Sequence, residues 1–154
     1  MAAPAPDLVE LLTFGRHVAE QGSMVGPEPI AYGSLAYAIH TGDRAAGLND
    51  IDFLAPASFG DLARILSPDP CLTVERTEYH TLKVSFGPLK VSFDALERYR
   101  PVARDGATRA SLDGFAFLVV GREALVGSYE RAAESIPQKG DAYLLKLRRL
   151  RDGS

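Results

Sequence analysis

The sequence predicts a mixed α/β fold of the α+β type, with helices flanking one β-sheet and further helices at the end of the chain. Three observations support this. Short apolar runs alternate with helical patterns up to residue 66, a stretch of period-two hydrophobicity follows at 72–93, and two helical patterns close the chain. We therefore expect a single domain over residues 1–154, with a core at about 7–100 and a C-terminal helical part at about 115–151.

The N-terminal part alternates helices and strands. Asp7 is placed to cap the first helix, and Gly22 is expected to end it. The turn Gly33-Ser34 follows a short apolar run, and Ser58 is expected to open a helix that stops before Pro68. We predict helices at 7–21, 35–40 and 58–66 and strands at 30–32 and 51–54.

The second part begins with strands. Alternating apolar residues around the turn Gly87-Pro88 predict a meander or hairpin. We predict strands at 72–77, 81–86, 89–93 and 115–120, a loop at 101–114, and helices at 123–134 and 140–151. In the last helix, four leucines are expected to form the packing stripe, namely Leu144, Leu145, Leu147 and Leu150.

Composition excludes several classes of protein. The net charge of −3 gives no strong reason to expect nucleic-acid binding. Cys71 is the only cysteine, so an intramolecular disulfide is impossible, and we expect its thiol to be buried. Neither an apolar run long enough for a membrane span nor a secretory signal is present, which predicts a cytoplasmic protein.

Two aspartates at the start of a predicted strand point to a metal. Asp50 and Asp52 are two positions apart, so both carboxylates face the same side of the strand, whereas Ile51 and Phe53 face an apolar layer. Adjacent carboxylates repel each other unless a cation lies between them. Mg²⁺ is commonly held by one or two carboxylates together with substrate phosphates. The pair therefore predicts a magnesium site.

A third aspartate and a tight turn extend this site. Asp94 ends a strand whose Val91 and Phe93 are expected to face the core. If that strand neighbours the Ile51 strand, Asp94 would complete a three-carboxylate cluster for two metals and would serve as the base for a hydroxyl proton. Gly33 would let the backbone approach a phosphate, and Ser34 at the start of a helix offers donors to its oxygens.

The order of these motifs resembles the signature of the polymerase-beta-like nucleotidyltransferase superfamily. A Gly-Ser turn at Tyr32-Gly33-Ser34-Leu35, a spacer, and Asp-x-Asp in an apolar strand at 49–54 carry the resemblance, which covers residues 30 to 95 well. The resemblance implies that Ser34 contacts nucleotide phosphate, that Asp50 and Asp52 bind Mg²⁺, and that Asp94 is the third carboxylate. Members include antibiotic adenylyltransferases, minimal nucleotidyltransferases of toxin-antitoxin operons and RNA-modifying enzymes.

Two further cations are candidates for nucleotide contacts. Arg44, in the loop before the aspartate pair, would reach a phosphate, although a solvated arginine is nearly as well supported. Lys139-Gly140-Asp141, followed by Lys146, is similar to the helix with a basic residue and a nearby Asp found in several small relatives. The remaining basic residues of the last helix fit a solvated face or a helix C-terminus.

The expected activity is Mg²⁺-dependent transfer of a nucleoside monophosphate from an NTP, with ATP as the expected donor, to an unidentified hydroxyl or phosphate acceptor. A small molecule, an RNA and a protein all stay open as acceptors. One alternative is a catalytically inactive protein of the same fold that binds a nucleotide or a cognate partner, as in a toxin-antitoxin pair. Another is an unrelated α+β domain, in which Asp94 would lie far from Asp50 and Asp52.

Overall fold

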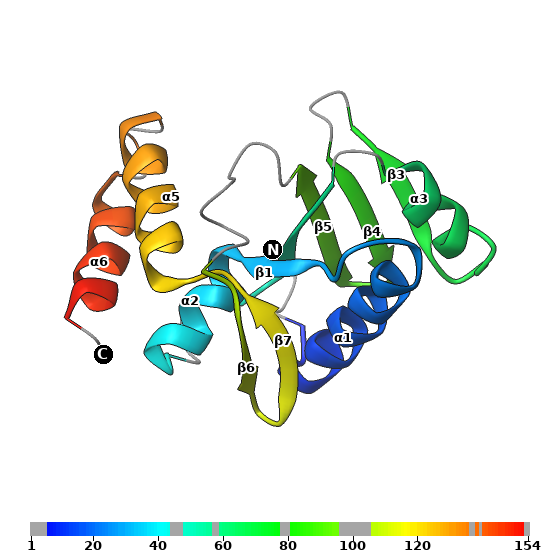
Figure 1. Ribbon diagram of the computed structural model, residues 1–154, viewed down its shortest axis with the longest axis horizontal. Helices are drawn as coiled ribbons and strands as arrows, with labels where there is room; N and C mark the ends of the chain where they lie inside the picture. The colour runs from blue at the N-terminus through cyan, green and yellow to red at the C-terminus, as the bar shows by residue number, and fades with distance from the viewer. Residues whose placement is uncertain are drawn as a thin grey trace, which may run out of the picture.

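The computed structural model describes residues 6–43, 48–56, 59–77, 81–95, 106–135, 138 and 140–152. Its centre is a seven-stranded mixed sheet in the order β3-β4-β5-β2-β1-β7-β6 (Figure 1). β1 and β7 are parallel, as are β2 and β5, and the other neighbours are antiparallel. The predicted fold class is confirmed. The strands are β1 (Ile30–Tyr32), β2 (Ile51–Ala55), β3 (Thr73–Arg76), β4 (Leu82–Phe86), β5 (Leu89–Ala95), β6 (Thr108–Leu112) and β7 (Phe115–Val119).

The helices α1 (Leu8–Val25) and α3 (Gly60–Leu66) pack against each other, and α1 covers one face of the sheet. Asp7 caps α1 as predicted, accepting a hydrogen bond from the backbone N–H of Glu10 at 3.0 Å. The prediction that Gly22 ends this helix is wrong. A side chain at that position would come within 2.6 Å of the Pro29 ring, so Gly22 allows the close approach of α1 to the segment before β1.

The same close approach brings α1 onto β2. A Cβ at Gly15 would lie 2.4 Å from the Ile51 side chain, which is fully buried. Beneath it, the Phe53 ring stacks on Phe93 with centroids 5.5 Å apart and contacts Phe117 at 6.1 Å. This apolar layer is the core that the alternating residues of β2 and β5 predict.

The helices α2 (Gly33–Thr41), α5 (Arg122–Ser135) and α6 (Gly140–Arg151) form a second group, away from α1 and α3 (Figure 1). Arg122 joins all three, because its guanidinium donates to the Leu150 carbonyl at 2.5 Å and to the His40 carbonyl at 3.0 Å. The two predicted C-terminal helices are therefore confirmed, and they are fastened to the helix that follows the Gly-Ser turn.

Three local predictions are wrong. The segment predicted as a loop at 101–114 contains β6, which forms a hairpin with β7. Cys71 is exposed, because it lies in a turn before β3, where its N–H donates to the Asp69 carboxylate at 2.9 Å. Leu144 and Leu145 are also exposed, and only Leu147 and Leu150 of the predicted stripe are buried. The predicted helix start at Ser58 lies outside the described residues.

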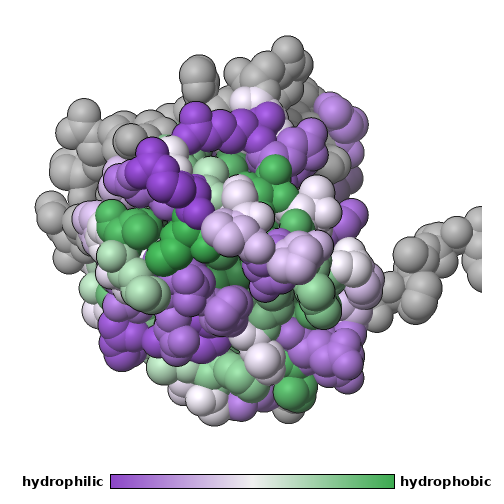
Figure 2. All heavy atoms as spheres, turned by 90° about the vertical axis from the view of Figure 1, so that its right-hand side faces the viewer, coloured by the Kyte–Doolittle hydropathy of each residue, from purple (hydrophilic) through white to green (hydrophobic). Residues whose placement is uncertain are grey.

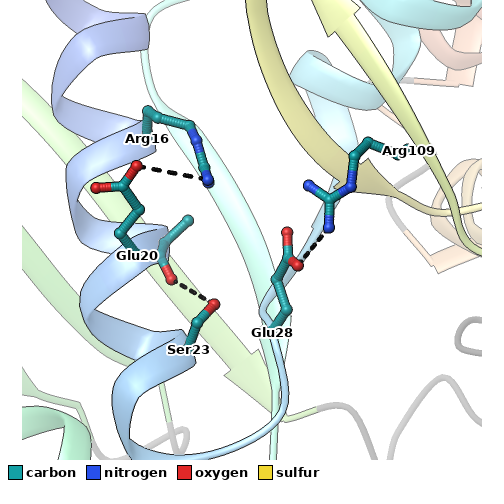
Figure 3. A network of polar contacts seen from close by, with 6 residues as sticks. Arg16, Glu20, Ser23, Glu28 and Arg109 are labelled. Carbon is teal, nitrogen blue, oxygen red and sulfur yellow. Dashed lines mark hydrogen bonds and ion pairs between the residues drawn. The ribbon is translucent and has the colours of Figure 1, made fainter.

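A polar contact holds the connector before β1 to the edge of the sheet. Arg109 of β6 donates to the Glu28 carboxylate at 2.5 Å, whereas Arg16 and Glu20 pair at 3.5 Å within α1 (Figure 3).

On the side of the molecule opposite to α5 and α6, hydrophobic patches are broken up by hydrophilic side chains (Figure 2).

Candidate active site

The Gly-Ser turn lies directly against the aspartate strand. β1 ends at Tyr32, and α2 begins at Gly33 with a φ of +61°, a conformation that favours glycine. A Cβ at Gly33 would stand 3.0 Å from the Asp52 Oδ2 atom. Tyr32 is also the antiparallel partner of Asp52 in the sheet. The two motifs that are widely separated in sequence therefore meet at one place.

Asp52 occupies an environment that disfavours its negative charge. Burial, and secondly the neighbouring Asp50 carboxylate, raise the pKa of Asp52 from 3.8 to about 7. Ile51 and Phe53 are fully buried on the opposite face of the strand, as the alternation predicts. The cost of this buried charge is relieved by a proton or by a bound cation.

Asp94 lies on the strand next to the pair and on the same face. In the parallel pairing of β2 and β5, Asp52 is opposite Ser92, and Asp94 is opposite Leu54, two pairs further along and therefore on the same face. Its carboxylate accepts hydrogen bonds from the Tyr32 hydroxyl and, at 2.8 Å, from the Thr81 hydroxyl. Tyr32 thus connects Asp94 to the turn at Gly33.

The donor set fits a divalent cation held in part by a substrate. Over the described ranges, no three His, Cys, Asp or Glu side chains are gathered into a metal site. Asp50 and Asp52 alone supply two neighbouring carboxylates, which is the protein share that Mg²⁺ commonly takes when phosphate oxygens supply other ligands. The structure does not gather Asp94 with them into the three-carboxylate cluster that the sequence predicts, and the Asp94 carboxylate instead accepts hydrogen bonds from Tyr32 and Thr81.

Helices α5 and α6 bring further polar groups towards this site. Tyr129 is 6% exposed, and its hydroxyl is buried without a hydrogen-bond partner among the residues described. Burial raises the pKa of Tyr129, and smaller contributions come from Tyr143, Tyr37 and Asp52. The Lys146 ammonium lies 5.3 Å from the ring centroids of both Tyr37 and Tyr129, and burial lowers its pKa. Asp52 is thus close enough to act electrostatically on α5.

The other predicted site residues have different positions. Ser34 is half-buried in the first turn of α2. Arg44 and Lys139 lie outside the described residues, so their nucleotide contacts stay predictions. His40 forms a hydrogen bond with the Val120 carbonyl at 2.7 Å, which gives it a structural role. Arg149 pairs with Asp43, so that this basic residue of α6 fastens α6 to the end of α2.

Sequence reasoning missed three residues of the site. Tyr32 and Thr81 hold Asp94, and Tyr129 lies in the field of Asp52. The position of Tyr32 directly before Gly33 was a signal for the first. Thr81 and Tyr129 carry none, because their proximity to the aspartates depends on strand register and on helix docking.

Comparison with solved structures identifies the fold as that of the nucleotidyltransferases. One similar structure is ANT(2″)-Ia in complex with adenylyl-2″-tobramycin, with a TM-score of 0.71 and 14% identity, covering 92% of this chain and 87% of that one. The antigenic nucleotidyltransferase-like protein from Paracoccidioides brasiliensis gives a TM-score of 0.68 at 14% identity, covering 96% and 78%. The Thermotoga maritima protein TM1012, a proposed nucleotidyltransferase, gives 0.63 at 16% identity, covering 92% and 96%.

Other comparisons add no closer relative. No protein-family model matches the sequence, and no curated protein does. Within the described part of the chain, no helix has the length and apolar character needed to cross a membrane. At these identities the similarity to the solved structures shows the fold alone.

Proposed function

We propose that this protein transfers a nucleoside monophosphate from an NTP, with ATP as the expected donor, to a hydroxyl group of an acceptor. The observation that supports this most directly is that the Asp52 carboxylate lies against the Gly33 turn. A Cβ atom added at Gly33 would be 3.0 Å from the Asp52 Oδ2 atom. A carboxylate suited to a cation thereby adjoins a helix start suited to a phosphate. The shared fold of the nucleotidyltransferases agrees with this assignment.

Each residue has a definite role in the proposal. Gly33 and Ser34 bind phosphate oxygens through backbone and hydroxyl donors. Asp50 and Asp52 would hold Mg²⁺, which when bound neutralises charge on the phosphates and orients them. Asp94 takes the proton of the acceptor hydroxyl, while its two hydrogen bonds from Tyr32 and Thr81 fix its orientation.

The proposed reaction is an in-line displacement at the α-phosphorus of the NTP. The acceptor oxygen forms a bond to the α-phosphorus of the NTP, and the bond from that phosphorus to the bridging oxygen of pyrophosphate breaks. The proton of the acceptor hydroxyl passes to Asp94, and pyrophosphate leaves. Positioning and charge stabilisation supply the rate enhancement, because the protein forms no covalent bond.

A glycine substitution tests the phosphate loop against a matched control. Gly33→Ala places a methyl group on the Asp52 carboxylate at a φ of +61°, whereas Gly87→Ala has a similar φ of +56° and no atom within 4 Å. Both changes strain the backbone to a similar extent. We expect Gly33→Ala to abolish Mg²⁺-dependent binding of ATP in a calorimetric titration, and Gly87→Ala to leave it intact.

Two outcomes would reject the assignment. Wild-type protein that binds no NTP with or without Mg²⁺ would exclude the enzyme and the nucleotide-binding alternative together. Mg²⁺-dependent binding without uptake of label from α-labelled NTPs into any fraction of a cell extract would favour the catalytically inactive alternative.

A further inference from the structure

The polar face of the sheet continues well beyond the aspartates. Five strands place one polar residue each in a single register row, in which neighbours are directly paired: Tyr32, Asp52, Ser92, Lys83 and Glu75. The core residues Val84 and Val91 face the opposite side, where they are fully buried. A row of this length on one face gives a polar floor that starts at the proposed catalytic pair.

A cavity of about 380 Å³ opens on this floor. Asp50 lies at one end, and the side chains of β5, β4 and β3 line the rest. Its lining includes Lys83, Ser85, Lys90, Ser92 and Glu75. Its volume falls within the range of small-molecule sites, which run from about 300 to 1,000 Å³. A ligand in this cavity would therefore be next to the metal-binding carboxylates.

The two lysines of this floor have no partner within the structure described. Lys83 and Lys90 come from adjacent antiparallel strands, Lys83 opposite Ser92 and Lys90 opposite Ser85. Both are exposed, and neither side chain forms a hydrogen bond or an ion pair with any described residue. Two ammonium groups and two hydroxyls of Ser85 and Ser92 are the donors that an anionic group needs.

We propose that this cavity binds the acceptor, and that the acceptor is a small hydroxylated molecule carrying a phosphate or carboxylate group. The inference rests on the proposed function, because it assumes that transfer takes place at Asp50 and Asp52. Neighbouring strands are about 4.8 Å apart, so Lys83, two strands from Asp52, lies roughly 10 Å from that carboxylate. The anionic group and the reacting hydroxyl would thus be separated by about the length of a monosaccharide phosphate.

Direct binding tests the acceptor class without relying on turnover. The anionic probes are glucose 6-phosphate, glucuronate and glycerol 3-phosphate. The first two are compared with glucose and with the amine glucosamine, and the third with glycerol, by calorimetry in the presence of Mg²⁺ and a non-hydrolysable ATP analogue. We expect the anionic probes to bind at least about tenfold more tightly than their neutral or amine parents, as one charge-assisted contact supplies that factor. Comparison of the phosphate-bearing probes with the carboxylate-bearing probe shows which anionic group is preferred.

The lysines are tested with a control on the opposite face of the neighbouring strand β3. K83Q/K90Q is expected to weaken binding of the preferred anionic probe by about 100-fold, at roughly tenfold for each lysine. R76Q removes one positive charge from β3, where Arg76 is exposed and reaches towards Gly60 on the α3 side. We expect R76Q to leave probe binding unchanged and both variants to bind ATP with Mg²⁺ as the wild type does.

The outcomes separate the two proposals. Normal binding of ATP with Mg²⁺, together with equal or weaker binding of the anionic probes, would overturn the acceptor class and leave the proposed function standing. Lysine-dependent binding of the anionic probes without any NTP binding would overturn the proposed function and with it the role of the probe as acceptor. Lysine-dependent binding of a short RNA, with none of the small probes bound, would also overturn the inference.

Discussion

The two faces of β2 and β5 differ in function, although they are built from alternate residues of the same strands: one face forms the core, and the other carries the candidate active site. On one face Ile51, Phe53 and Phe93 are fully buried, and Ile51 lies against Gly15 of α1. On the other face Asp50, Asp52 and Ser92 are only partly buried, and the cavity adjoins them. The apolar face stabilises the sheet, whereas the other face holds carboxylates that repel each other. Stability and chemistry are therefore separable by substitutions one residue apart.

The largest effect is expected from Asp52→Asn. The change removes one of the two proposed cation ligands while keeping size and shape, so nucleotide transfer should fall by at least about 10⁴-fold. The measurement is label transfer from an α-labelled NTP, with folding checked by circular dichroism. Asp61→Asn on α3, where the carboxylate is exposed and pairs with Arg64, is the control. Activity close to that of the wild type in Asp52→Asn would remove Asp52 from the site.

The opposite face is tested one residue further along the strand. Phe53→Ala removes a ring that stacks on Phe93 and contacts Phe117, so we expect the free energy of unfolding to fall by about 3–5 kcal/mol. Urea denaturation measures the change. At temperatures where the variant is still folded, its affinity for ATP with Mg²⁺ should stay within about threefold of the wild-type value. A large loss of affinity in the folded variant would show that the two faces are not separable.

How much of this arrangement the sequence predicts depends on whether a feature is local. The Gly33 turn, the aspartate pair and the alternation in β2 and β5 are set by neighbouring residues, and the structure has them as predicted. The hairpin partner β6 was missed, since Thr108–Leu112 is mostly polar or exposed and has little hydrophobic periodicity. Exposure of Cys71 was missed because the turn at Asp69 precedes the strand.

Features that depend on pairing between strands could not be predicted from the sequence. The offset that puts Asp94 opposite Leu54 is set by the β2–β5 register. The positions of Lys83 and Lys90 next to Ser92 and Ser85 on the polar floor likewise depend on the register of the β4–β5 hairpin. Because a shift of one residue would turn either lysine to the core face, the alternation fixes the face on which each lysine lies but not its partners on the neighbouring strands.

The polar face is also expected to make the stability of the protein depend on pH, through Asp52. The pKa of Asp52 is about 7 in the folded protein and ordinarily 3.8. Between these values the folded state holds a proton that the unfolded chain has released, so the free energy of unfolding falls as pH rises from about 4 to about 7. The loss from this group is on the order of 4 kcal/mol in metal-free protein. Denaturation at a series of pH values measures it.

Two variants check the origin of this pH dependence. Asp52→Asn should remove most of the slope and be more stable than the wild type at pH 8, whereas Asp61→Asn should keep the slope. Addition of Mg²⁺ at pH 8 should stabilise the wild type and leave Asp52→Asn unchanged. A slope that is the same in wild type and Asp52→Asn would assign the effect to other groups.

The smallest effect is expected at the support of Asp94. Thr81→Val keeps the shape of the side chain and removes the 2.8 Å hydrogen bond to the carboxylate, so the free energy of unfolding should fall by about 0.5–1.5 kcal/mol. Thr73→Val is the matched control, because Thr73 is exposed on the same face of the sheet and should change stability by no more than about 0.5 kcal/mol. If Asp94 is the base, Thr81→Val should also lower the rate of transfer with unchanged affinity for the NTP, because the hydrogen bond orients the group that takes the proton. An equal loss in NTP affinity would show that Thr81 maintains the structure of the polar face as a whole, so that stability and chemistry would not be confined to separate faces of the sheet.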